Sequence, residues 1–295
     1  MSRNSWFRIF SVAAAAVIVA FAAGPLVHGQ VSFTSVPLPA GFGQLDTSAP
    51  PVPVPQLIKE FTEKESMYRD AMNDYTYERS VMVQTVNDDN KVDGQYFDVT
   101  DISYDPTGRK VEHVVDAPVN TLERVIMTPA DFSDIEHRLP FVLTTEDAAQ
   151  YNITYVGKQR IDDVDTYVFN VEPKVIEKGH RYFDGRIWVD QQDHQIVVTD
   201  GKNVPDDLRK GHEDLSLPFI TYRQQIDGKY WFPVYTHEDG ELHFTGDGYQ
   251  DVHLRETVKY TNYKRFRTSI RVLYGGQDIT GKQPEQPQTP PKKPQ

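Results

Sequence analysis

The chain of 295 residues contains no cysteine. Disulfide bonds, thiolate metal ligands, a thiol nucleophile and a lipid-modified N-terminal cysteine are therefore all excluded. Basic residues are also scarce, because 31 Lys and Arg stand against 43 Asp and Glu, which gives a net charge of −12. That balance argues against nucleic acid and against anionic lipid surfaces as electrostatic partners. Stability must come from a packed core, which a chain of this length can form.

The chain also lacks an apolar run long enough to cross a bilayer comfortably. The longest run, residues 10–23, has about 14 residues, whereas a transmembrane helix needs roughly 20. Arg3 and Arg8 precede it, as in a secretory signal peptide. We therefore predict a signal peptide in residues 1–30, cleaved near residues 29–30, and a mature protein in the bacterial periplasm. The alternative is an uncleaved N-terminal anchor, because further apolar residues follow the run.

Proline is concentrated at the two ends of the expected mature chain. Residues 31–55 contain six prolines and residues 275–295 contain five. Proline removes backbone donors and favours extended chain over helix or central strand. The sequence therefore predicts a Pro-rich disordered linker (31–55), one folded β domain (56–274) and a Pro-rich disordered tail (275–295).

The folded part opens with a helical pattern. Between residues 56 and 73, Leu57, Phe61 and Tyr68 recur at spacings of four and seven, which places them on one face of a helix. Pro55 suits the first turn of this helix. The charged residues expected on the opposite face are Lys59, Glu60, Glu63, Lys64 and Glu65.

After residue 75 the apolar period changes from 3.6 to 2, which predicts strands. Turn residues separate them, including Asp227-Gly228 and residues 238–240. Residues 120–150 interrupt the strands with three expected helical turns, at 121–124, 128–135 and 144–149. Without helical crossovers the strands should pair antiparallel. The expected strands are 75–85, 95–104, 110–115, 151–160, 166–172, 180–190, 195–199, 219–225, 230–236, 241–245 and 251–267.

Motifs for catalysis and for metals are missing. His237-Glu238 is followed by Glu241 and His243, so the helical His-Glu-x-x-His zinc arrangement is absent. No Gly-x-Ser-x-Gly elbow, phosphate-binding glycine loop or dinucleotide fingerprint occurs. We therefore predict no catalytic residue, no metal site and no cofactor, and the protein is not expected to be an enzyme.

One hairpin carries a resemblance to a known family. Residues 185–190 read Gly-Arg-Ile-Trp-Val-Asp, with Asp193 in the turn and Ile-Val-Val at 196–198 on the return strand. This hairpin, the strand at 163–173 before it and the exported N-terminus with one helix resemble the outer-membrane lipoprotein-sorting (LolA/LolB-like) superfamily. The resemblance covers about residues 56–270. The Pro-rich ends and the longer C-terminal half depart from the simplest family members.

The resemblance implies a mainly β (α+β) fold, a strongly curved antiparallel half-barrel of about 10–11 strands covered by the N-terminal helix and the short helical insertion. It implies a carrier that holds lipid acyl chains or a lipoprotein in an apolar cavity, with envelope proteins and a transient membrane contact as further partners. The alternative that we keep is a non-catalytic structural or interaction module of the cell envelope. The candidate cavity residues are Tyr77, Val81, Val83, Tyr167, Phe169, Val171, Ile187, Val189 and Phe232.

Overall fold

A computed structural model describes most of the chain between residues 41 and 278. The described residues are 41–105, 109–137, 139–206, 216–244, 250–266, 273–274 and 277–278. Contacts divide the chain into residues 1–32 and residues 33–295, and every described residue belongs to the second unit. The expected signal peptide lies outside the described residues, as does the expected tail except for 277–278. Among the described residues, no helix has the length and apolarity needed to span a bilayer.

Helix α1 (Val54–Met72) confirms the helical pattern and begins two residues earlier than expected. Pro55 lies in its first turn, where the missing N–H would have no partner within the helix. Leu57, Phe61 and Tyr68 are buried, as their spacing predicted. Glu65, which was expected to face solvent, is 0 % exposed. That expectation was wrong, because Glu65 has a buried partner on a strand far away in the sequence.

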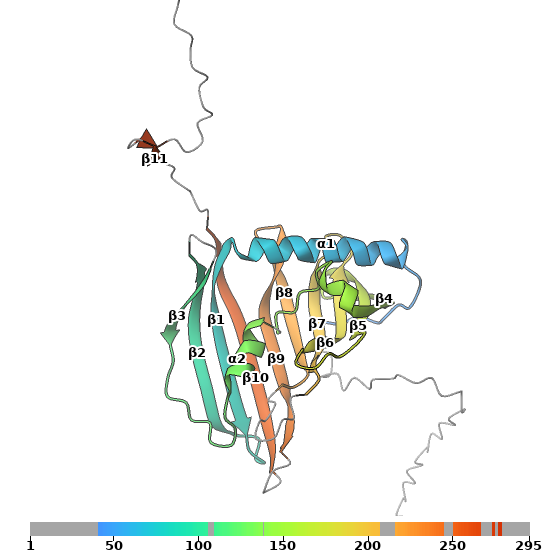
Figure 1. The fold of residues 1–295 in the computed structure, drawn as a ribbon. Helices are drawn as coiled ribbons and strands as arrows, with labels where there is room; N and C mark the ends of the chain where they lie inside the picture. Colours follow the sequence, from blue (N-terminus) through green and yellow to red (C-terminus); the bar gives the residue numbers. More distant parts are fainter. Residues whose placement is uncertain are drawn as a thin grey trace, which may run out of the picture. The chain divides into compact units, whose positions relative to one another are not determined.

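Ten strands form one open antiparallel sheet, which confirms the expected mainly β fold (Figure 1). Their order is β3-β2-β1-β10-β9-β8-β7-β6-β5-β4, so the last long strand pairs with the first. The strands are β1 (Tyr75–Val86), β2 (Val92–Tyr104), β3 (Lys110–Asp116), β4 (Tyr151–Ile161), β5 (Val164–Pro173), β6 (Tyr182–Asp190), β7 (Ile196–Val204), β8 (Phe219–Ile226), β9 (Tyr230–Phe244) and β10 (Gln250–Arg265).

The segment between β3 and β4 carries the short helices. Helix α2 (Pro129–His137) and a 3₁₀ turn, η1 (Asp147–Gln150), overlap two of the three expected helical turns, and each ends later than expected. Residues 121–124 are not helical. A separate two-stranded ladder joins β11 (Leu273–Tyr274) and β12 (Gln277–Asp278).

One expected turn is absent. Residues 238–240 lie inside β9, which runs without interruption where two strands were expected. Glu238 pairs in register with Glu256 of β10 and with Phe219 of β8. The β10 ladder runs through all three residues, and β8 pairs with Glu238, so the stretch stays extended and the local preference for a turn is overruled.

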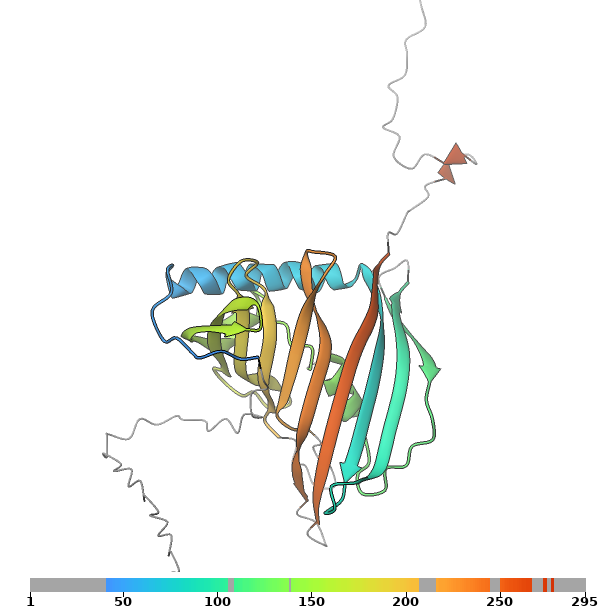
Figure 2. The ribbon, with the colours of Figure 1, turned by 180° about the vertical axis from the view of Figure 1, so that it is seen from behind.

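The two faces of the sheet bury different clusters. The inner face, which we define as the face covered by α1, carries the larger cluster, and α1 runs across the strands in both views (Figures 1 and 2). The outer face carries a smaller cluster around Trp188. Part of the expected linker contributes to it, because Phe42 bridges to Ile161 of β4 and its ring meets Trp188 edge-on at 5.4 Å. At these residues the segment assigned to a linker packs on the domain.

Candidate functional site

The residues predicted to line a cavity all lie on the inner side of the sheet, and the fold brings most of them together. Seven are buried in the inner cluster, and Tyr77 packs against it. Phe232 belongs instead to a neighbouring cluster with Tyr68 and Tyr75. The seven buried residues are Val81, Val83, Tyr167, Phe169, Val171, Ile187 and Val189.

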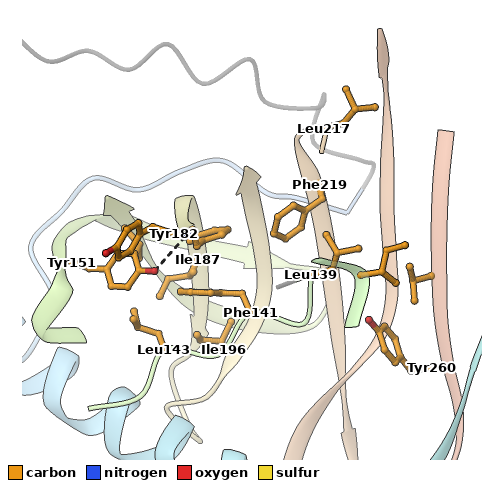
Figure 3. Close-up of a cluster of buried hydrophobic side chains, with 14 of the residues drawn as sticks. Leu139, Phe141, Leu143, Tyr151, Tyr182, Ile187, Ile196, Leu217, Phe219 and Tyr260 are labelled. Atoms are coloured by element: carbon orange, nitrogen blue, oxygen red, sulfur yellow. Dashed lines mark hydrogen bonds between the residues drawn. The ribbon is translucent and has the colours of Figure 1, made fainter. Parts of the chain in front are cut away.

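These residues are covered by α1 and by the segment after α2. The rings of Phe61 and Phe169 lie 5.2 Å apart, so α1 packs directly on β5. Phe141 stacks on Phe183 of β6 at 4.2 Å. Figure 3 shows Phe141 and Leu143 gathered with other apolar side chains over the strands. The predicted set is therefore in contact with the protein's own side chains rather than with an open hollow.

A pocket of about 380 Å³ lies beside this packed region. It is bounded by the end of α1, the end of α2, the segment that follows α2, and strands β4, β6 and β7. None of the nine predicted residues borders it. Its lining residues are Arg69, Met72, Glu136, His137, Pro140, Phe141, Val142, Tyr151, Arg181, Tyr182, Phe183 and Asn203.

The walls of this pocket are mainly apolar and aromatic. Phe141 and Phe183 form a stacked pair, and Tyr151 lies edge-on to Phe141 with 6.2 Å between centroids. The Tyr151 hydroxyl accepts a hydrogen bond from the Phe183 backbone N–H at 3.3 Å, which orients the ring. Met72 closes the side formed by α1. The sequence analysis missed these residues because five separate chain segments meet at the pocket.

A buried ion pair holds α1 against the sheet. Arg223 of β8 donates to the two carboxylate oxygens of Glu65 at 3.0 and 3.1 Å, and both side chains are almost fully buried. The Ile196 N–H also donates to Glu65, at 3.2 Å. Arg223 further donates to the Phe141 carbonyl and lies 4.9 Å from the centre of the Tyr68 ring. Burial raises the pKa of the Glu65 carboxyl, and the charge of Arg223 opposes that rise.

A second polar feature is a cavity of about 20 Å³ under α2, which we call the acidic cavity. Such a space holds about one water molecule. Glu238 and Glu256 face it from opposed positions on β9 and β10. Asp131 and Asp134 face it from α2. The other residues around it are Ile135, Leu139, Asn203 and Ser216.

Glu256 is a buried carboxyl of the acidic cavity with an incomplete set of partners. The residue is 7 % exposed, and its Oε1 has no hydrogen-bond partner in the described part of the chain. Burial, together with the charges of Asp131 and Asp134, raises the pKa of Glu256 to about 8. Glu256 is therefore mostly protonated at neutral pH.

The acidic cavity and the larger pocket share a wall. Asn203 borders both, and the ion pair between Arg181 and Asp134, at 2.7 Å, joins the lining of one to the lining of the other. Helix α2 borders both as well, with Asp131 and Asp134 on the acidic cavity and Glu136 on the pocket. The position of α2 therefore affects both spaces.

No metal centre is found in the described residues, where no group of three or more His, Asp and Glu side chains has the geometry to hold an ion. The histidines singled out by sequence instead take part in pairs with carboxylates. His243 lies 2.7 Å from Asp251, and His237 lies 4.0 Å from Asp239.

Comparison with known proteins gives one similarity of fold. No protein-family profile and no curated protein sequence matches the chain. Among solved structures, a domain from Vibrio parahaemolyticus that is named for outer membrane lipoprotein sorting is similar at 12 % sequence identity and a TM-score of 0.30. The alignment covers 72 % of this chain and 94 % of that chain. It is a protein of the class that the hairpin at 185–198 resembles.

Proposed function

We propose that this chain is a non-catalytic periplasmic carrier that holds an acyl chain of a lipid or lipoprotein. The observation that carries the proposal is the pocket of about 380 Å³ beside Met72, Phe141 and Phe183. Its volume falls within the range of roughly 300–1,000 Å³ that is typical of small-molecule sites. Each methylene group buried against such walls contributes about 0.8 kcal/mol, so affinity needs no covalent chemistry.

The packed inner face offers a way to enlarge the site. Beneath α1 it presents a continuous apolar surface that includes the seven buried residues of the predicted set. α1 is one helix laid across the strands, and Glu65 with Arg223 is its buried polar anchor. Phe169 lies beneath Phe61, so a ligand that enters beside Met72 would reach it only by lifting α1 past the Glu65–Arg223 anchor. The predicted residues would then form the inner part of the acyl site.

The test is binding of a dansyl-labelled fatty acid to the purified protein, followed by fluorescence. Met72→Asp puts a charge on the wall of the pocket and should weaken binding by about tenfold or more, which corresponds to about 1.4 kcal/mol. Met67→Asp is the matched control, because Met67 lies on the same helix and is 50 % exposed. Equal affinities for the two variants would contradict the placement of the ligand in this pocket.

Lipid extraction from protein purified out of the cell envelope tests the function itself. A co-purified lipid would support the carrier. Protein free of lipid that also fails to bind the labelled fatty acid would favour the alternative, an interaction module.

One observation favours that alternative: the edge strand β3 exposes Val111, Val114 and Val115. An edge strand with apolar side chains can add a strand from a partner.

A further inference from the structure

Helix α2 is held on the inner face by the apolar Ile135 and, unusually for a helix on a sheet, also presents carboxyl groups to that face. Asp134 and Ile135 are its buried residues. Asp131 and Asp134 face Glu238 and Glu256 across the acidic cavity. Like charges opposite one another on a sheet are destabilising, and the addition of two more from a helix increases the repulsion. Some of this charge has to be neutralised for α2 to stay in place.

Partners account for part of that neutralisation. Asp134 is paired with Arg181, which lies just before β6. Glu238 accepts the Leu217 N–H at 3.2 Å. Glu256 has no such partner for its Oε1, and its neighbour across β1 is the apolar Val83. Arg181, the partner of Asp134, borders the larger pocket rather than the acidic cavity.

We propose that a proton on Glu256 holds α2 against the sheet, and that loss of this proton loosens α2 and opens the pocket beside it. The second half of this inference rests on the proposed function, because the pocket matters only if it holds a ligand. The link between the two spaces is α2 itself, since its carboxylates face the acidic cavity while Glu136 and His137 border the pocket. The chain segment that continues from α2 supplies Phe141.

The direction of the pH effect follows from the burial of Glu256. Its pKa is about 8, against 4.5 for the free side chain, so the folded state binds the proton more tightly than the unfolded state does. Between these two values stability falls as pH rises, and above pH 8 it levels off. Protonated Glu256 therefore predominates at pH 6.5 and ionised Glu256 at pH 9.5. Measurements at pH 6.5 and at pH 9.5 therefore compare α2 held against the sheet with α2 loosened from it.

The absence of cysteine makes a ligand-free test possible, because introduced cysteines will be the only sites for spin labels. Ser133 on α2 and Lys259 on β10 are both exposed. Double electron–electron resonance on Ser133→Cys with Lys259→Cys should give one narrow distance at pH 6.5 and a longer, broader distribution at pH 9.5. With Glu256→Gln added, which mimics the protonated carboxyl, the distribution should stay narrow at both pH values.

Controls separate this inference from the carrier proposal. Glu241→Gln alters a carboxyl on the same sheet but away from the acidic cavity, and it should leave the pH response intact. Circular dichroism verifies folding, and Glu256→Met replaces Glu256→Gln if the latter is unstable. An unchanged distance in the parent pair, or a pH response that survives Glu256→Gln, overturns the inference. The distance measurements need no ligand. If the protein fails to bind fatty acid but shows the pH-dependent distances, the carrier function is contradicted and the role of Glu256 is not.

Discussion

Removal of the Arg223 guanidinium should destabilise the protein more than loss of any surface ion pair. In Arg223→Met the Glu65 carboxyl would remain at 0 % exposure with only backbone donors such as the Ile196 N–H. The Phe141 carbonyl would lose a donor as well. Breaking a buried pair by removing one partner costs about 3–5 kcal/mol. For a folded part of this size that corresponds to a fall in Tm of roughly 6–20 °C.

The double variant Glu65→Leu/Arg223→Met gives the second half of this prediction. Replacing both members by apolar side chains leaves no unpaired buried charge. The free energy of unfolding of the double variant should therefore be within about 1 kcal/mol of the parent value or above it. Arg265→Met is the control, because its pair with Asp74, at 3.3 Å, is about half exposed. That substitution should cost at most about 1 kcal/mol.

Urea denaturation followed by tryptophan fluorescence measures these differences, because Trp188 is buried at 0 % exposure. The loss in Arg223→Met should be smaller at pH 5 than at pH 8. Burial raises the pKa of Glu65 and Arg223 opposes the rise, so without Arg223 the carboxyl can take up a proton in acid. A loss below 1 kcal/mol for Arg223→Met at pH 8, or no recovery in the double variant, would refute the anchoring role of this pair.

Three further variants test the packing of the sheet and the titration of a buried carboxyl. Gly185→Ala should lower the free energy of unfolding, measured by urea denaturation, by about 3 kcal/mol, because its Cβ would lie 2.3 Å from a backbone oxygen of β7. Gly179→Ala is the control, because a Cβ there meets open space. It should cost only the roughly 1–2 kcal/mol that an L side chain pays at a φ of +83°. Burial raises the pKa of Asp200 from 3.8 to about 6, and the charge of Arg186 opposes that rise. The free energy of unfolding should therefore fall as pH rises from 3.8 to 6 and level off above pH 6. Asp200→Asn should flatten that slope, and an unchanged slope would reject the assignment.

Local patterns were enough to predict the elements of this fold. The spacing of Leu57, Phe61 and Tyr68 predicts α1, because a helix places such residues on one face whatever surrounds it. Asp227-Gly228 predicts the turn between β8 and β9, where both residues adopt positive φ. Alternation of apolar residues predicts the strands, and the lack of crossover helices predicts their antiparallel pairing.

Features that depend on contacts between distant residues could not be read in this way. Glu65 resembles its charged neighbours in sequence, and only folding brings Arg223 to it. Residues 238–240 read as a turn, but pairing with β10 along the whole stretch, and with β8 at Glu238, keeps them extended. The pocket and the acidic cavity are likewise made where separate segments meet. Side-chain periodicity is a property of one segment, whereas burial, charge pairing and hollow space arise between segments and require their arrangement in three dimensions.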